Sequence, residues 1–173
     1  KFNNKAHLFA PLKIRGVNLK NRIVVSPMCQ YSSQNNGHPG DWHLVHLGSR
    51  AVGGAGLVFS EATAVNPEGR ISPWDLGIWR DEHIPSFSRI TDFIKSQNSV
   101  PGIQIAHAGR KASRETPWNN GDEIRKENGG WQTVGPSPLS FSEEDSVPKE
   151  LTKQEINQII EDFTKAAERS IHA

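Results

Sequence analysis

The chain has 173 residues, of which 35% are hydrophobic and 23% charged, an ordinary composition for a globular domain that can bury a core. Twenty Lys and Arg residues against 19 Asp and Glu residues leave a net charge of +1, so no global field favours nucleic acid or an anionic membrane surface. We therefore expect neither as a partner, and charge does not identify the ligand.

Cys29 is the single cysteine, which excludes an intrachain disulfide and favours a reducing, cytoplasmic compartment. Residues 1–9 lack the apolar run of a signal peptide, and no later stretch approaches the ~20 apolar residues of a membrane span. The first residue is Lys, and the last helical pattern reaches Ala173 without a stop signal. We expect a segment of a longer protein.

The first part of the chain predicts a hairpin, a strand and a helix. Residues 13–19 alternate around Gly16 like a small hairpin, and residues 21–25 form a short apolar run typical of a buried strand. Turn-forming residues 32–40 follow. The segment from Trp42 to Val52 has helical length, and Gly53-Gly54 can end it.

The same order then repeats twice. Residues 56–62 and 100–106 predict a second and a third strand. Between them, apolar residues spaced three and four apart predict a helix with one buried face: Ile84, Phe87, Ile90, Phe93 and Ile94. Residues 107–150 form a loop too long for a plain connector, so we expect it to be functional or locally folded.

The third helix has a sharply defined start. Thr152 and Glu155 form a T-x-x-E capping box. Five apolar residues after it form a stripe on one helical face: Ile156, Ile159, Ile160, Phe163 and Ala167.

Three strand–loop–helix units indicate an α/β fold with a parallel sheet, either a barrel or a doubly wound sheet. Long loops after strands and short links after helices favour a (β/α)8 TIM barrel, which needs about 250 residues when complete. We expect residues 1–173 to be the N-terminal part of a single barrel domain. The glycines of Gly53-Gly-Ala-Gly56 lie between a helix and a strand, the reverse of the order in a dinucleotide-binding turn.

Several ordered motifs resemble the Old Yellow Enzyme family of flavin oxidoreductases. Ser26-Pro-Met-Cys-Gln-Tyr31 is similar to that family's flavin-binding loop, and cysteine at position 29 is similar to the branch of xenobiotic reductases and thermophilic-type ene reductases. The resemblance extends through Leu8-Phe-x-Pro-Leu12, Leu19-Lys-Asn-Arg22, Gly53-Gly-Ala-Gly-Leu57, Glu61-Ala62, Gly69-Arg70, residues 102–111, Pro117-Trp118, Gly130-Trp131 and Gly135-Pro-Ser-Pro138.

The resemblance implies an FMN-containing barrel that takes hydride from NAD(P)H and reduces the activated C=C bond of an α,β-unsaturated carbonyl compound. Two alternatives stay open. The chain could belong to the barrel of a larger flavin and iron–sulfur reductase of the dienoyl-CoA reductase type, or it could be a non-catalytic fragment used for binding or assembly.

The resemblance also assigns roles to individual residues. Ser26, Pro27, Met28, Cys29, Ala62 and Gln104 would contact FMN. The Cys29 thiol would approach the N5 region and tune the flavin, and Gln104 would pair with its pyrimidine edge. Tyr31 would contact the substrate, which makes Tyr31 and Cys29 the catalytic candidates.

These residues also allow other interpretations. Taken alone, Cys29 would be a small buried thiol and Tyr31 a wall residue, but their neighbours in the motif favour the flavin site. His43 and His46 lie three apart without a third ligand at suitable spacing, so we expect a packing pair and no metal. Arg110 and Lys111 are possible site residues.

Part of the family's active site has no counterpart in this sequence. The resemblance implies two substrate-binding histidines and a nearby proton-donating tyrosine after strand four, and His172 lies on the preceding helix instead. We expect the missing C-terminal half of the barrel as partner, possibly a homo-oligomer, and an isolated segment that is inactive. The physiological alkene and the choice between NADPH and NADH are not determined by the sequence.

Overall fold

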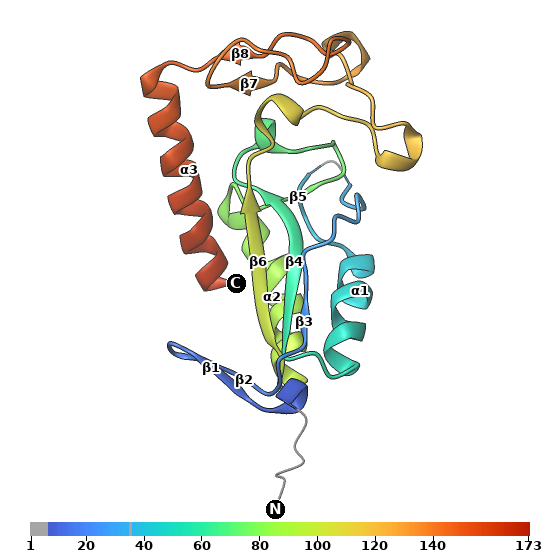
Figure 1. The fold of residues 1–173 in the computed structure, drawn as a ribbon, viewed down its shortest axis with the longest axis vertical. Helices are drawn as coiled ribbons and strands as arrows, with labels where there is room; N and C mark the ends of the chain where they lie inside the picture. The colour runs from blue at the N-terminus through green and yellow to red at the C-terminus, as the bar shows by residue number, and fades with distance from the viewer. Residues whose placement is uncertain (1–6, 35) are drawn as a thin grey trace, which may run out of the picture.

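The computed structural model describes residues 7–34 and 36–173. A hairpin precedes the main sheet: β1 (Leu12–Ile14) pairs antiparallel with β2 (Val17–Leu19) across a two-residue turn in which Arg15 has a φ of 51°. It lies at the end of the molecule where the strands of the main sheet begin (Figure 1). The hairpin expected at residues 13–19 is confirmed.

The main sheet is parallel. β4 (Leu57–Ala64) is its central strand, with β3 (Val24–Val25) on one side and β6 (Val100–Ala106) on the other. A short strand that the sequence did not predict, β5 (Leu76–Gly77), extends the β3 side along the end of β4. Because every pair is parallel, all of these strands end at the same edge of the sheet.

The strand expected at residues 21–25 is shorter than predicted. The Asn21 side chain accepts the Ile23 N–H at 3.1 Å and donates to the Gly54 carbonyl at 2.7 Å. These bonds hold the backbone in a bend before Val24, and regular pairing begins only there.

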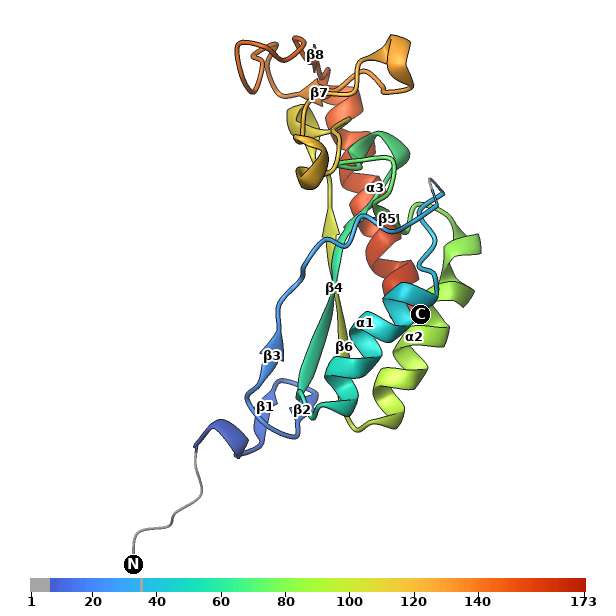
Figure 2. The ribbon, with the colours of Figure 1, turned by 90° about the vertical axis from the view of Figure 1, so that its right-hand side faces the viewer.

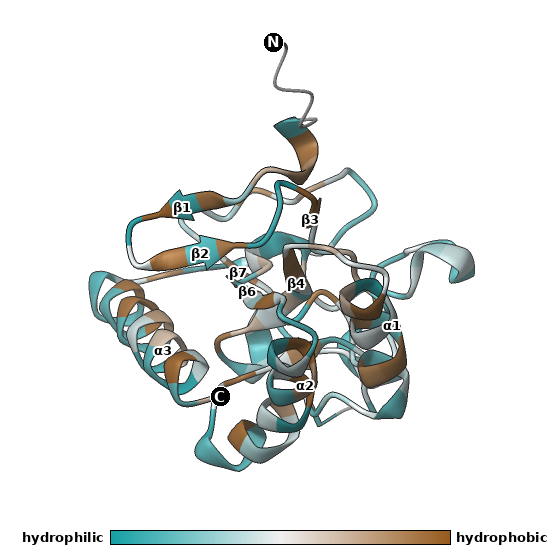
Figure 3. Cartoon of the chain, turned by 90° about the horizontal axis from the view of Figure 1, so that it is seen from below, coloured by the Kyte–Doolittle hydropathy of each residue, from teal (hydrophilic) through white to brown (hydrophobic). Residues whose placement is uncertain are grey.

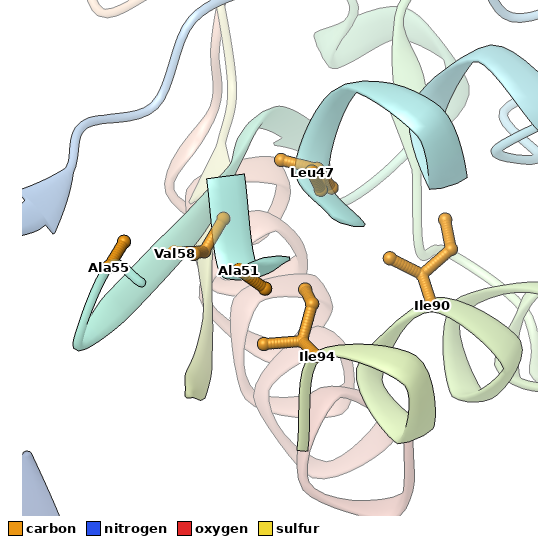
Figure 4. Close-up of a cluster of buried hydrophobic side chains, with 6 residues drawn as sticks. All are labelled: Leu47, Ala51, Ala55, Val58, Ile90 and Ile94. Atoms are coloured by element: carbon orange, nitrogen blue, oxygen red, sulfur yellow. The ribbon is translucent and has the colours of Figure 1, made fainter. Parts of the chain in front are cut away.

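Two helices cover one face of the sheet. α1 (Asp41–Val52) and α2 (Ile84–Ser96) pack against each other and against the strands (Figure 2). Figure 4 shows the apolar cluster that they enclose with β4, which comprises Leu47, Ala51, Ala55, Val58, Ile90 and Ile94. Removing these side chains from water is the main force that holds the layer together.

α3 (Lys153–His172) starts with the expected capping box, in which Thr152 accepts the Glu155 N–H and Glu155 accepts the Thr152 N–H. Phe163 and Ala166 pack in a second apolar cluster with residues of α2 and the sheet. Ile156 and Ile160 of the expected stripe are exposed, because it is the C-terminal half of α3 that contacts this cluster.

The long segment 107–150 is locally folded, as expected. It contains 3-10 turns at Gly109–Lys111, Pro117–Asn119 and Lys126–Asn128, and β7 (Val134–Gly135) pairs with β8 (Lys149–Glu150). Arg114 bonds both oxygens of Asp145, at 3.1 and 2.8 Å. The segment lies beyond the C-terminal ends of the strands (Figure 1).

The second face of the sheet has little cover. Figure 3 shows the three helices flanking the strands in an arc. On the other face, Phe59 and Ala62 are half-buried and Gln104 is exposed. Successive strand–helix units around a parallel sheet are the arrangement of a partial (β/α)8 barrel.

Among the described residues, no helix is both long and apolar enough to cross a membrane.

Candidate functional site

The segment after β3 crosses from the end of its own strand to the end of β4 (Figure 2). There the backbone N–H of Ala62 faces the sulfur of Cys29 and favours the charged form of the thiol. The Tyr31 hydroxyl is directed at the same sulfur as a second donor. The fold therefore brings together three of the predicted residues, from two strand ends.

Ala62 and Gln104 lie side by side on neighbouring strands. They are register partners of β4 and β6, directly after a shift in the pairing between Ser60 and Ala62. Parallel partners point to the same face, and here that is the face without helices. The amide of Gln104, which has both a donor and an acceptor, is exposed beside the small side chain of Ala62.

The other three predicted flavin contacts precede Cys29. Ser26 and Met28 are exposed and Pro27 is half-buried. The Met28 carbonyl accepts the side-chain amide of Gln30 at 2.9 Å, which helps to shape the turn. All seven predicted residues thus lie at or just after the C-terminal half of a strand.

Tyr31 has a backbone conformation that the sequence did not predict. Its φ is +48°, so the loop is not extended there, although the side chain still reaches Cys29. The Trp118 ring, from the long segment, meets the Tyr31 ring edge-on at 5.6 Å. Burial, followed by the charges of Cys29 and Asp75, raises the pKa of Tyr31 to about 12, so its hydroxyl keeps its proton at neutral pH.

Cys29 also keeps its proton. Burial and then the charge of Asp75 raise the pKa of the thiol, and the donor groups of Ala62 and Tyr31 that face the sulfur oppose this only in part. A thiolate nucleophile requires the opposite shift. The environment favours a neutral thiol.

Two buried carboxyl groups, for which the sequence motifs predicted no role, lie next to this site. Glu61 and Asp75 are each 3% exposed. Burial raises the pKa of Glu61 to about 7 and that of Asp75 to about 6, against hydrogen bonds that favour the charged forms. Glu61 lies in a run of apolar strand residues, and a charged residue there is seldom buried without a partner, which is the signal that could have identified it.

The cationic residues near the strand ends mostly contact the long segment. Arg110 donates to the carbonyls of Leu139 and Ser140 at 3.2 and 3.4 Å, and the Lys111 ammonium lies 4.3 Å from the centre of the Phe141 ring. Both contacts brace the segment.

Arg70 lies between two indole rings. Its guanidinium carbon is 5.5 Å from the centre of the Trp79 ring and 5.0 Å from that of Trp131. It thereby links the loop after β4 to the long segment.

The histidines of α1 are buried packing residues. His43 and His46 are 0% and 6% exposed, and burial lowers the pKa of each. No group of three or more His, Cys, Asp or Glu residues that could hold a metal occurs in the described part of the chain. His172 is exposed at the end of α3.

Comparison with known proteins identifies relatives of the whole chain. An NADPH dehydrogenase of Bacillus cytotoxicus is 47% identical over 167 residues, which cover 96% of this chain and 44% of the relative. The chain therefore spans less than half of that relative's length.

Solved structures with similar folds point to the same kind of enzyme as the sequence relatives. An Old Yellow Enzyme from Pichia sp. AKU4542 superposes with a TM-score of 0.82 at 26% identity, covering 95% of this chain and 42% of the other. A 2-naphthoyl-CoA reductase in complex with 2-naphthoyl-CoA gives a TM-score of 0.79 at 26% identity, covering 94% and 25%. These neighbours are barrels of which the chain matches a part, so the expected fold class is confirmed.

The NADH:flavin oxidoreductase / NADH oxidase family matches residues 7–173. This confirms, at the level of the family, the flavin and nicotinamide cofactors expected from the sequence. The chain belongs to the NADH:flavin oxidoreductase family, that of the Old Yellow Enzymes.

Proposed function

We propose that this chain provides the flavin-binding face of an FMN-dependent ene reductase, which uses NAD(P)H to reduce the activated C=C bond of α,β-unsaturated carbonyl compounds. The observation that carries the proposal is the gathering of Cys29, Tyr31, Ala62 and Gln104 at the ends of parallel strands. In open and closed α/β folds alike, ligands bind at this edge of the sheet.

The residues present suit an FMN ring. Gln104 offers a donor and an acceptor to the alternating groups of the flavin pyrimidine edge, and the small Ala62 beside it leaves room for the ring. The backbone of residues 26–29 and the Cys29 thiol would contact the part of the ring near N5. When bound, FMN supplies the chemistry of hydride acceptance and donation, and the protein positions and tunes it.

Tyr31 would orient the substrate. Its hydroxyl is protonated at neutral pH, and when a substrate binds its single hydrogen would turn from the Cys29 sulfur to the carbonyl oxygen of an enone. Polarising that carbonyl withdraws electrons from the conjugated alkene and makes its β-carbon a better hydride acceptor. The neutral Cys29 thiol would modulate the electronics of the ring without forming a covalent bond.

The proposed active site needs residues from outside this sequence. The chain covers 44% of its Bacillus relative, and the sheet face that carries Gln104 lacks cover. We propose that the second half of a single barrel domain provides the carbonyl-binding histidines expected after strand four, in a cytoplasmic protein that can associate further into a homo-oligomer.

A larger reductase is the second candidate. The likeness to 2-naphthoyl-CoA reductase, of which the chain covers 25%, supports a barrel followed by further domains. The 47% identity to an NADPH dehydrogenase against 26% to that reductase favours the simpler enzyme. A non-catalytic assembly role, the third alternative, has no observation of its own in its favour.

Reassembly of the barrel tests the proposal. The chain is combined with the part of the Bacillus cytotoxicus enzyme beyond the matched region, and NADPH oxidation is followed with and without 2-cyclohexen-1-one. We expect a yellow FMN complex whose NADPH oxidation depends on the enone, and no such activity from the chain alone. A complex without flavin would contradict the proposed function, and full activity of the chain alone would contradict the need for a second half.

A further inference from the structure

Glu61 occupies the position of a β-bulge. Ser60 pairs with Ile103 and Ala62 pairs with Gln104, so β4 advances by two residues while β6 advances by one. The extra residue is Glu61, and both it and Ser60 are buried. Bulges re-aim side chains next to functional sites, and this one places a carboxyl group beneath the segment that carries Cys29 and Tyr31.

The Glu61 carboxyl group holds that segment through its backbone. The N–H of Gln30 donates to Oε1 at 2.9 Å, and the N–H of Tyr31 faces the same carboxyl group closely enough to favour its charged form. Tyr31 has a φ of +48°, a left-handed conformation that is costly for a bulky residue and persists only where the surroundings impose it. The hydrogen bond from Gln30 to Glu61 and the approach of the Tyr31 N–H to the same carboxyl group are contacts of this kind.

His43 of α1 approaches the carboxyl group from the helical layer. Its Nδ1 accepts the Gly40 N–H at 3.0 Å, so in the neutral ring the proton is on Nε2. That nitrogen is 3.7 Å from Oε2 of Glu61. Nε2 is buried and has no hydrogen-bond partner within 3.5 Å among the described residues, and the Glu61 carboxyl group is the acceptor that it faces.

We propose that Glu61 is a positioning residue which, supported by His43, fixes Cys29 and Tyr31 in the geometry of the flavin site. The bulge brings its carboxyl group to the loop, the two backbone N–H groups attach the loop to it, and the Nε2–H of His43 orients it from behind. The consequence for catalysis rests on the proposed flavin function, whereas the hold on the loop does not.

The attachment of the loop to Glu61 can be measured without flavin, because Cys29 and Tyr31 can each be followed separately. The chain has one Cys and one Tyr, so alkylation by iodoacetamide reports on Cys29 and the ultraviolet titration of phenol reports on Tyr31. Glu61→Gln keeps the size of the side chain but replaces one acceptor oxygen with an N–H donor. Releasing the loop should return the thiol toward its ordinary acidity and exposure, and the larger thiolate fraction outweighs the weaker nucleophilicity of a less basic thiolate, so alkylation at neutral pH speeds up.

We expect Glu61→Gln to raise the alkylation rate at neutral pH with an acid shift of its pH profile, and to lower the pKa of Tyr31 from about 12 toward 10. Release of the loop and loss of the Glu61 charge both act in this direction. Substitutions of His43 keep that charge and so isolate the hold on the loop. His46→Gln is the matched control, since His46 is buried on the same helix and stacks with Trp42; it should leave both probes unchanged. Equal effects of the two substitutions, or none from Glu61→Gln, would overturn the proposal.

A second pair of variants covers the case in which Glu61→Gln does not fold, as judged by circular dichroism. His43→Gln keeps an N–H donor near the place of Nε2, whereas His43→Leu removes it. The proposal requires near wild-type alkylation in the first and accelerated alkylation in the second, and equal rates would overturn it. FMN binding is titrated separately. Loss of the flavin site then changes FMN affinity alone, whereas release of the loop from Glu61 changes the alkylation rate of Cys29.

Discussion

Ala62 of β4 and Gln104 of β6 are register partners directly after the bulge at Glu61. Without the extra residue, the period-two alternation of a strand would turn Ala62 toward the helices. The bulge therefore places a small side chain and an amide next to each other on the open face of the sheet. In the proposed flavin site, this pair contacts the pyrimidine edge of the flavin ring.

Gln104→Leu should weaken FMN binding to the reassembled barrel by about 10- to 100-fold, since the bonds lost to the flavin edge are worth about 1.5–3 kcal/mol together. Stability should hardly change, because Gln104 is exposed. Quenching of flavin fluorescence gives the dissociation constant. Gln154→Leu on α3 is the control, and equal affinities of the two variants would remove Gln104 from the site.

Ile94→Ala should lower the free energy of unfolding by about 2–5 kcal/mol, as expected for truncating an aliphatic side chain in a packed core. Ile94 is 2% exposed in the cluster between α1, α2 and β4 (Figure 4). Urea denaturation measures the change. Ile171→Ala, at a position 82% exposed, should stay within about 0.5 kcal/mol, and a similar loss in both would contradict the described core.

Thr152→Ala should cost about 1 kcal/mol by removing the cap of α3. The Thr152 hydroxyl accepts the Glu155 N–H at 3.2 Å, and alanine leaves that donor to water. Thermal unfolding followed by circular dichroism measures the difference. Thr164→Ala, at an exposed position within the same helix, should have a smaller effect, and the reverse order would show that α3 does not start at this cap.

Asp75 should make stability fall with rising pH. Its pKa rises from 3.8 to about 6 in the fold, so the folded state binds more protons than the unfolded chain between these values. The advantage of wild type over Asp75→Asn is then largest below pH 3.8 and is lost as the pH rises through about 6, with a total change of at most about 3 kcal/mol.

Unfolding free energies of both proteins across this pH range provide the measurement. Asp92→Asn, at an exposed position of α2, is the control. An advantage of wild type that grows with pH would show that Asp75 is stabilised as a carboxylate.

Local patterns predicted much of the fold. The alternation around Gly16, the residues of β6 and the Thr152–Glu155 box all rely on neighbours in the chain, and the structure has them where expected. The motif around Cys29 likewise identified the candidate site, because those residues lie in one loop and at two strand ends.

The features that the sequence did not predict depend on tertiary contacts. The bulge at Glu61 is a property of pairing with β6, and the left-handed conformation of Tyr31 lies next to the hydrogen bond from Gln30 to that distant carboxyl group. The role of His43 depends on the Gly40 N–H, which selects the tautomer. None of these relationships leaves a periodic pattern in the chain.

Protection of Cys29 by FMN tests the central claim most directly. In the reassembled barrel, iodoacetamide alkylation of the peptide that contains Cys29 is quantified by mass spectrometry at increasing FMN. If the flavin lies against the loop after β3, saturating FMN should slow the alkylation by at least about tenfold, with a midpoint equal to the dissociation constant from fluorescence. FMN that binds without changing the alkylation rate of Cys29 would place the flavin elsewhere and contradict the account.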